Sequence, residues 1–134
     1  MERRGRVNVL LDTHVLLWAI LSPASLTRKT SKIIANPANA ILVSAASAWE
    51  IATKVRLGRL PGAERLEAEF LEAMEGSGYE LVPIRAEVAL RAGRFRSEHR
   101  DPFDRVIAAQ ALQDDIPVLS SDEKLDTFLV QRIW

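Results

Sequence analysis

The sequence predicts an α/β protein with a mostly parallel central sheet flanked by helices, a three-layer arrangement. Two patterns carry this prediction: short, almost wholly apolar segments that suit strands buried on both faces, and longer helical segments that alternate with them. Composition agrees, because 134 residues with 48% hydrophobic and 27% charged side chains are enough for one domain with its own core. We therefore expect a single domain over residues 1–134.

The first half of the chain contains two expected strands. Val7–Leu11 and Ala40–Val43 are nearly all aliphatic, so both suit the inside of a parallel sheet. Asp12 ends the first strand where it can cap a helix, and Gly58 marks the end of a later helix. The expected helices of this half are Val15–Ile20, Leu26–Ala35 and Ser44–Leu57.

The second half continues the alternation. Apolar residues recur at helical spacing from Leu66 to Met74, beside a face rich in glutamate. Asp101 and Pro102 form a typical helix start, a capping residue followed by proline in the first turn. The expected helices are Glu64–Glu75, Glu87–Gly93 and Pro102–Asp114, the expected strands are Tyr79–Ile84, Pro117–Leu119 and Val130–Trp134, and a short helical turn spans Glu123–Leu125.

Composition excludes several classes of protein. The sequence has no cysteine, which excludes thiol catalysis, cysteine zinc sites and disulfides. Its 18 basic and 18 acidic side chains cancel, so any attraction for nucleic acid must be local. The start of the chain resembles a secretion signal, with Arg3, Arg4 and Arg6 before an apolar stretch, but Asp12 and His14 interrupt that stretch. We therefore expect a cytoplasmic protein that does not contact membranes.

Four carboxylates fall near the ends of the expected strands. Asp12 follows the first strand, Asp122 follows a later one, and Glu50 lies in the helix after the second strand. Asp104 lies in the first turn of helix Pro102–Asp114. Ligands bind at the carboxyl edge of such sheets because loops and helix N-termini converge there. If the four side chains converge, they form an all-oxygen pocket suited to Mg²⁺ or Mn²⁺.

Three of these acids also have purely structural explanations. Asp12 and Asp122 can equally be helix caps. Glu50 completes a capping-box spacing with Ser47 and lies four residues before Lys54, the spacing of a routine helical ion pair. Taken one at a time, these residues do not distinguish a metal site from ordinary helix stabilisation.

Asp104 is harder to explain structurally. Asp101 already caps this helix, and Asp104 shares the apolar face of Ile107, Ala108 and Ala111. A lone carboxylate is costly to bury, so it needs a partner such as a cation. We therefore interpret Asp104 as a metal ligand.

Signatures of other chemistries do not occur. The sequence has no phosphate-binding glycine loop, zinc-protease motif or nucleophile elbow, and Ser121-x-x-Lys124 lacks the companion motifs of acyl-serine enzymes. His14 and His99 have no metal-ligand spacing, so we interpret them as structural or substrate-facing. Three aromatic residues that could stack on bases are expected to lie in the core instead: Trp18, Trp49 and Phe103.

Five sequence blocks occur in order over essentially the whole chain. Together they resemble a PIN-domain ribonuclease, specifically the VapC-type toxin of bacterial toxin–antitoxin pairs. A single block is weak evidence, whereas five in register with compatible spacing are specific. The blocks are Leu10–Trp18, Trp49–Ile51, His99–Arg105, Ala108–Ala111 and Ser120–Asp122.

The resemblance implies a PIN-like fold and a metal-dependent endoribonuclease that a cognate antitoxin neutralises. It further implies one or two Mg²⁺ or Mn²⁺ ions and a homodimer, for which the helical segments Ala45–Val55 and Leu66–Met74 offer surfaces. Thr13 and Ser120 match hydroxyl positions that hold the acids, although the family more often has threonine where Ser120 stands. The matching acids, first to fourth, are Asp12, Glu50, Asp104 and Asp122.

Positive charge gathers near the third acid. Six arginines occur between positions 85 and 105, whereas the segment Glu64–Glu75 holds five glutamates. We expect a basic lip beside the acidic pocket, with Arg100 and Arg105 nearest the scissile phosphate. The alternative is ordinary solvated surface charge.

Two other functions remain open from the sequence. A phosphoacceptor receiver domain is also an α/β chain of this size with magnesium-binding acids, but it needs paired acids after the first strand, where Asp12 stands alone. A non-catalytic PIN-like interaction module is expected to have lost some of the acids, and all four are present. The sequence therefore favours the nuclease.

Overall fold

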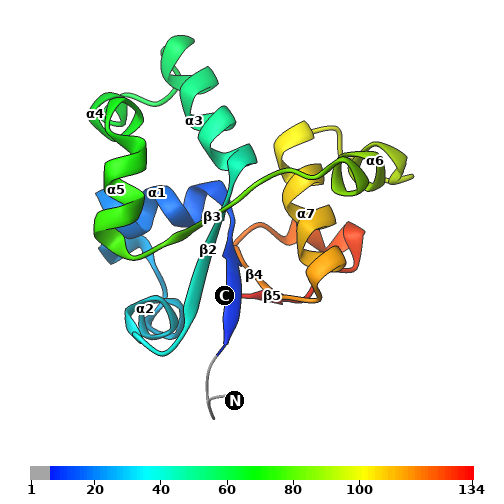
Figure 1. The fold of residues 1–134 in the computed structure, drawn as a ribbon, viewed down its shortest axis with the longest axis horizontal. Coiled ribbons are helices and arrows are strands. Elements are labelled where there is room, and N and C mark those ends of the chain that lie inside the picture. Colours follow the sequence, from blue (N-terminus) through cyan, green and yellow to red (C-terminus); the bar gives the residue numbers. More distant parts are fainter. Residues whose placement is uncertain (1–6) are drawn as a thin grey trace.

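A five-stranded sheet runs through the middle of the molecule in the order β3-β2-β1-β4-β5, and every neighbouring pair is parallel (Figure 1). The structure is a computed structural model that describes residues 7–134, so the arginines at 3, 4 and 6 lie outside the described residues. The predicted parallel sheet is confirmed. Its strands are β1 (Asn8–Leu11), β2 (Ala40–Ser44), β3 (Glu80–Val82), β4 (Val118–Leu119) and β5 (Arg132–Ile133).

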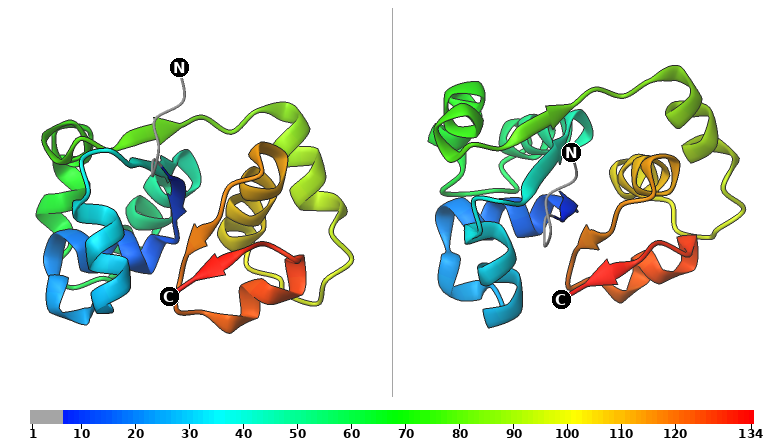
Figure 2. Two further views of the ribbon diagram at one scale, coloured as in Figure 1. Left: turned by 90° about the horizontal axis from the view of Figure 1, so that it is seen from below. Right: turned by 60° about the horizontal axis from the view of Figure 1, so that its bottom comes forward.

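Helices cover both faces of the sheet and give the predicted three layers (Figure 2). In the first half of the chain they are α1 (Thr13–Leu21), η1 (Pro23–Ser25), α2 (Arg28–Ala35) and α3 (Ala45–Arg56). In the second half they are α4 (Glu64–Ala68), α5 (Phe70–Ser77), α6 (Ala86–Arg94), α7 (Pro102–Asp114) and η2 (Glu123–Phe128), where η marks a 3-10 helix. Among residues 7–134, no helix is long and apolar enough to span a membrane.

The apolar run of β1 is explained by burial on both faces. Val9 and Leu11 pack with side chains of α1, α3 and α5 on one side of the sheet. Leu10 points to the opposite side, where it packs with Ile107 and Ala108 of α7. Because successive strand residues face opposite sides, a strand between two helical layers must be apolar at every position.

Several predicted elements have different limits in the structure, and the last expected strand, Val130–Trp134, is reduced to β5. The expected helix Glu64–Glu75 is two helices, because the backbone at Glu69 leaves helical geometry (φ −111°, ψ 30°) and separates α4 from α5. The expected strand Tyr79–Ile84 is shortened to β3. Proline at position 83 has no N–H to donate to a sheet, which suits the end of the strand there.

Candidate active site

The pairing of β1 with β4 places the first acid. Leu11 pairs with Leu119, so Asp12 and Ser120 leave the sheet side by side. Asp12 is 4% exposed, and Ser120 Oγ donates a hydrogen bond of 2.6 Å to its Oδ2. Burial raises the pKa of the Asp12 carboxyl, while the hydrogen bond from Ser120 opposes that rise. The Ser120 hydroxyl therefore contacts the Asp12 carboxylate, the contact that the resemblance implied for this position.

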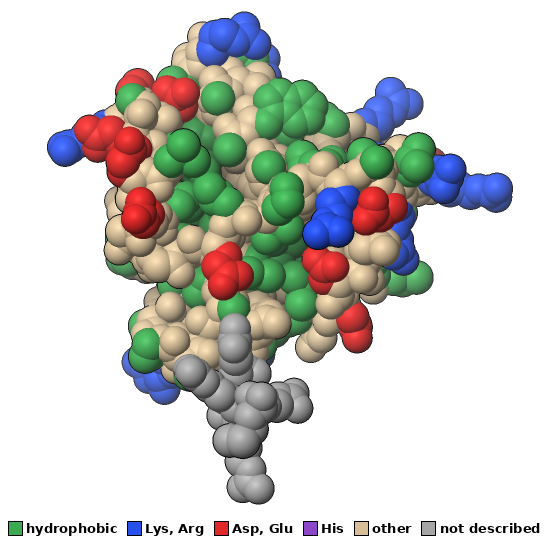
Figure 3. Space-filling view, in the orientation of Figure 1, with side chains coloured by type: hydrophobic (Ala, Val, Ile, Leu, Met, Phe, Trp, Pro, Cys, Tyr) green, Lys and Arg blue, Asp and Glu red, His purple; other side chains and the backbone are tan. Residues whose placement is uncertain are grey.

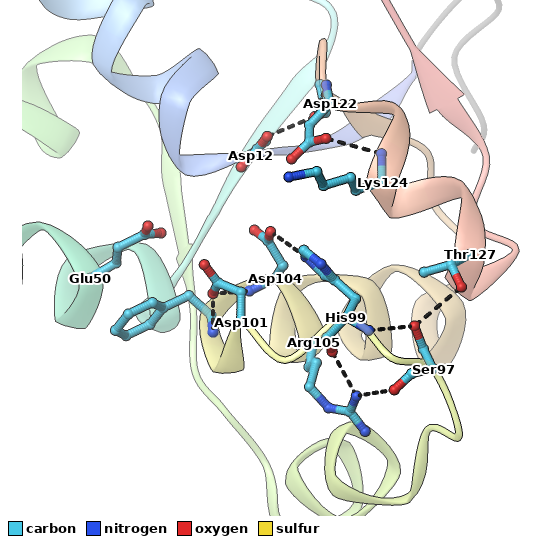
Figure 4. Close-up of polar contacts among 12 residues, drawn as sticks. Asp12, Glu50, Ser97, His99, Asp101, Asp104, Arg105, Asp122, Lys124 and Thr127 are labelled. Atoms are coloured by element: carbon cyan, nitrogen blue, oxygen red, sulfur yellow. Dashed lines mark hydrogen bonds and ion pairs between the residues drawn. The ribbon is translucent and has the colours of Figure 1, made fainter.

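The fourth acid is tied to the same serine. The backbone N–H of Asp122 donates to Ser120 Oγ at 3.0 Å. Asp122 Oδ1 accepts from the backbone N–H of Lys124 at 3.0 Å, so this residue caps η2 as the structural explanation predicted. In Figure 4 the carboxylate of Asp122 and the side chain of Lys124 point toward the same space as Asp12. Ser120 thus links the first and fourth acids through its single hydroxyl.

The second acid comes from the middle of α3. Glu50 is 3% exposed, and its Oε2 pairs with Lys54 one turn later on the same helix, so the predicted ion pair is confirmed. Its other oxygen, Oε1, is buried and has no hydrogen-bond partner. The capping-box interpretation is wrong, because Ser44 caps α3 by accepting from the N–H of Ala46.

Thr13 is placed differently from the expectation that it holds an acid. Its Oγ1 forms a buried hydrogen bond of 2.9 Å with Ser47 Oγ. This bond ties the first turn of α1, directly after Asp12, to α3, which carries Glu50. The Thr13 hydroxyl therefore joins α1 to α3, and its contact is with Ser47 rather than with an acid.

The third acid lies in the first turn of α7. Asp101 Oδ1 accepts from the N–H groups of Phe103 and Asp104 at 2.9 and 3.1 Å, which confirms Asp101 as the helix cap. The Asp104 carboxylate, 14% exposed, forms a 2.8 Å hydrogen bond with His99 Nε2. Burial, together with the negative charges of Asp12 and Asp101, raises the pKa of Asp104 to about 6 against the opposing effect of His99.

His99 reaches Asp104 because Arg105 organises the loop between α6 and α7. The Arg105 guanidinium donates to the backbone carbonyls of Ser97 and His99 at 3.3 and 2.9 Å (Figure 4). It also donates to the carbonyls of Ala92, at 2.9 Å, and Phe95. The sequence interpretation missed this role. The available signal was the arginine directly after Asp104 in the helix, one turn beyond Asp101. The N–H groups of Arg105 are already bonded to backbone carbonyls. A direct contact of Arg105 with RNA stays a prediction.

The four predicted acids come from separate elements that meet at the carboxyl edge of the sheet. Figure 4 shows Asp12, Asp104 and Asp122 around one space, with Glu50 facing it from α3. The charge of Glu50 contributes to the raised pKa of Asp12, and the charge of Asp12 to that of Asp104. The carboxylates are therefore close enough to influence one another electrostatically.

Comparison with known proteins identifies the family to which this chain belongs. A family model for the PIN domain matches residues 9–128. The chain belongs to the PIN domain family. The resemblance seen in the sequence is confirmed at this level, and the receiver-like alternative is excluded. PIN domains are generally nucleases that use divalent metals.

Three solved structures share this PIN fold at low sequence identity. VapBC2 from Rickettsia felis, bound to a DNA fragment from their promoter, has a TM-score of 0.69 and 17% identity, covering 95% of this chain and 98% of that chain. FitAcB from Neisseria gonorrhoeae has a TM-score of 0.63 and 19% sequence identity, covering 94% of this chain and 96% of that chain. FitAB bound to an IR36 DNA fragment has a TM-score of 0.62 and 17% sequence identity, covering 93% of this chain and 93% of that chain. A search of curated proteins gives no match.

The acids of this PIN domain fit a divalent cation by their chemistry. All four offer carboxylate oxygens, the donors that Mg²⁺ and Mn²⁺ prefer, and Glu50 Oε1 is buried without a partner. Within residues 7–134, however, no three histidine, cysteine, aspartate or glutamate side chains are gathered tightly enough to enclose an ion as they stand. The assignment of all four acids as metal ligands therefore stays a prediction.

Proposed function

We propose that this PIN domain is a metal-dependent endoribonuclease, the toxin of a VapC-type toxin–antitoxin pair. The observation that carries the proposal is the approach of four carboxylates, from separate elements, to one space at the sheet edge (Figure 4). Each of them is an acid that the sequence resemblance matches to a metal ligand of VapC-type toxins: Asp12, Glu50, Asp104 and Asp122.

The cofactor of this reaction is Mg²⁺ or Mn²⁺, as one or two ions held by these four acids. A divalent cation bound there neutralises phosphate charge and activates water for attack on the phosphodiester. The chain's own residues orient the acids for this task. Ser120 fixes Asp12 through a short hydrogen bond, and His99 fixes Asp104 in the same way. These contacts limit the rotation of two acids whose burial already restricts them.

Positive side chains beside the acids suit the phosphates of RNA. An open hollow next to the site is lined by two cations, Arg96 and Lys124, and one acid, Glu98, together with Ser97, His99 and Thr127. Arg100 is exposed on the same loop, immediately before the cap of α7. We assign Arg100 and Lys124 to phosphate contacts, because exposed cations at the rim offset the repulsion between an acidic pocket and a polyanion. The contribution of Arg105 to RNA binding is then indirect, through the loop that carries Arg100.

The partners of this protein are RNA, a cognate antitoxin and a second copy of the chain. The similar VapBC2 structure is bound to a DNA fragment from their promoter, and FitAB is also bound to DNA, which supports a toxin–antitoxin complex that regulates its own genes. The segments Ala45–Val55, apart from the face that carries Trp49, and Leu66–Met74 remain the proposed surfaces for the antitoxin and the homodimer. Its RNA substrate places the protein in the cytoplasm.

The test compares RNA cleavage by the wild type with cleavage by Asp12→Asn and Asp104→Asn. Purified proteins are incubated with RNA and Mg²⁺ or Mn²⁺, and RNA ends are sequenced after brief induction in cells. Both variants should fold and lose cleavage and growth arrest, because each removes a carboxylate charge from the metal site. Asp101→Asn is the matched control, since asparagine caps a helix nearly as well. Equal loss from Asp101→Asn, or cleavage that survives in Asp12→Asn, would contradict the proposal.

A further inference from the structure

Two aromatic side chains form an exposed pair beside the acids. Trp49 is 54% exposed, so the expectation that it belongs to the core is wrong. Its ring meets that of Phe103 edge to face, with centroids 4.6 Å apart and an interplanar angle of 75°. Trp18, by contrast, is half-buried and packs against Trp134. An exposed indole is a large apolar surface left in contact with water, and it indicates a binding site more often than an exposed aliphatic residue does.

The pair is joined to the acidic site by the chain itself. Trp49 directly precedes Glu50 in α3, and Phe103 directly precedes Asp104 in α7. Consecutive residues of a helix point about 100° apart. When the two acids face into the site, their aromatic neighbours therefore face its rim. The aromatic pair spans the two helices that supply the second and third acids.

The outer face of α3 beyond Trp49 carries one cation and no exposed acid. Ala52, Thr53 and Arg56 share the outer face of α3 with Trp49, and Arg56 is exposed. The only acid of α3 is Glu50, which is buried. Figure 3 shows Lys and Arg side chains at the far end of α3, whereas Asp and Glu side chains lie over α4 and α5. No exposed acid of α3 would therefore repel a phosphate that lies near Trp49.

We propose that Trp49 and Phe103 form a stacking site for an unpaired base of the RNA, next to the phosphodiester that is cut; this inference rests on the nuclease function proposed above. Every base has an aromatic face, and proteins that bind single strands stack such faces on exposed aromatic side chains. In a duplex both faces of a base are covered by its neighbours. The site therefore selects RNA that is single-stranded or looped at the point of cleavage.

A protein partner fits this face less well than a nucleotide does. A helix of another protein needs a continuous apolar stripe with anchors three and four residues apart. On the outer face of α3, the residues three, four and seven positions after Trp49 are Ala52, Thr53 and Arg56, which are small, polar and charged. One exposed indole surrounded by such residues suits a single ring with phosphates on either side.

The test measures binding of RNA without cleavage. A labelled single-stranded RNA of mixed sequence is titrated into the Asp12→Asn protein, with and without Trp49→Ala, and affinity is read by fluorescence anisotropy. Trp49→Ala should weaken binding about tenfold, as expected for the loss of one stacked base. Trp49→Phe should restore most of the affinity. Leu90→Ala is the matched control, because Leu90 on α6 is exposed to the same 54% and should have no effect.

Two further readouts separate stacking from a general loss of structure. RNA binding should quench the indole emission of the parent protein, and Trp49→Ala should remove that quenching. The other two tryptophans, Trp18 and Trp134, are half-buried against each other and should not report a base stacked on Trp49. The same RNA annealed to its complement should bind Trp49→Ala and its parent equally well. Duplex binding that falls as much as single-strand binding would overturn the stacking site.

The remaining outcomes distinguish this inference from the proposed function. If the wild type cleaves RNA while Trp49→Ala leaves single-strand affinity unchanged, the stacking site is overturned and the nuclease stands. If Trp49→Ala keeps its RNA affinity but loses antitoxin binding or self-association in sedimentation, the pair belongs to a protein interface and the inference is overturned. A wild type that neither binds nor cleaves RNA would overturn both.

Discussion

The two sides of the acidic site are built in different ways. On the α3 side, Glu50 lies in the middle of a helix and pairs with Lys54, a residue of that same helix. On the loop side, Asp104 lies in the first turn of α7 and pairs with His99 from the irregular segment 95–101. That segment is held by Arg105, whose guanidinium donates to several of its carbonyls.

The difference shows where the site is vulnerable. A helix satisfies its own backbone hydrogen bonds, so the position of Glu50 depends only on the packing of α3. A loop has no such ladder, and its carbonyls need partners from elsewhere. Here a single cationic side chain supplies them. The loop side should therefore fail when one residue is changed, whereas the α3 side should tolerate more.

The largest expected effect is that of Arg105→Ala. We expect the free energy of unfolding to fall by about 2–3 kcal/mol, because half-buried carbonyls lose hydrogen bonds to a charged donor. Urea denaturation measures the loss, and hydrogen exchange should become faster in segment 95–101 and not in α3. Arg100→Ala, on the same loop but exposed, should change stability by less than about 0.5 kcal/mol. Unchanged exchange in Arg105→Ala would mean that the loop holds itself.

The next effect concerns the pH dependence of the loop side. The pKa of Asp104 is raised from 3.8 to about 6 in the folded protein, so the folded state binds this proton more tightly than the unfolded chain does. The stability that this protonation contributes is complete below pH 3.8 and is lost as the pH rises through 6. In the presence of a chelator, the wild type should therefore lose about 2 kcal/mol from this group over that range.

Asp104→Asn removes this loss and keeps the other acids. In chelator at pH 7 the variant should unfold at a higher temperature than the wild type, and its stability should depend less on pH. Melting curves between pH 4 and 7 measure both. If the two proteins show parallel pH profiles, the charge of Asp104 is not costly in the folded state.

A smaller effect is expected on the α3 side from Lys54→Met. The change leaves the buried Glu50 carboxylate without its cation, and we expect a loss of about 1 kcal/mol in chelator, because Lys54 is partly exposed and the pair is partly solvated. The freed carboxylate should bind Mn²⁺ several-fold more tightly, measured by calorimetry. Lys54→Arg, which keeps the charge, is the control. Unchanged Mn²⁺ affinity in Lys54→Met would argue against Glu50 as a metal ligand.

The smallest effect is expected from Asp101→Asn. Asp101 caps α7 through two backbone N–H groups, and asparagine can accept the same bonds, so stability should change by less than about 0.5 kcal/mol. Asp101→Ala should cost about 1 kcal/mol in the same denaturation experiment. Similar losses from both variants would show that the charge, rather than the cap geometry, stabilises the helix.

Much of the frame could be predicted from the sequence because it depends on local patterns. The apolar run of β1 implied a strand buried on both faces, and Asp101 with Pro102 marked the start of α7. The spacing of Glu50 and Lys54 implied their ion pair. The division of the expected helix at Glu69 was not predictable in this way, because its apolar spacing continues across the break.

The sequence by itself determined the alternation of strands and helices and placed three acids after strand ends, since hydrophobic period and helix caps act over a few neighbouring residues. Only the tertiary structure decided the contacts of His99 with Asp104, the use of Arg105 as a donor to loop carbonyls, and the exposure of Trp49. These depend on how a segment without periodicity folds and on which surfaces other elements leave uncovered. Such contacts join residues through space, and no local pattern encodes them.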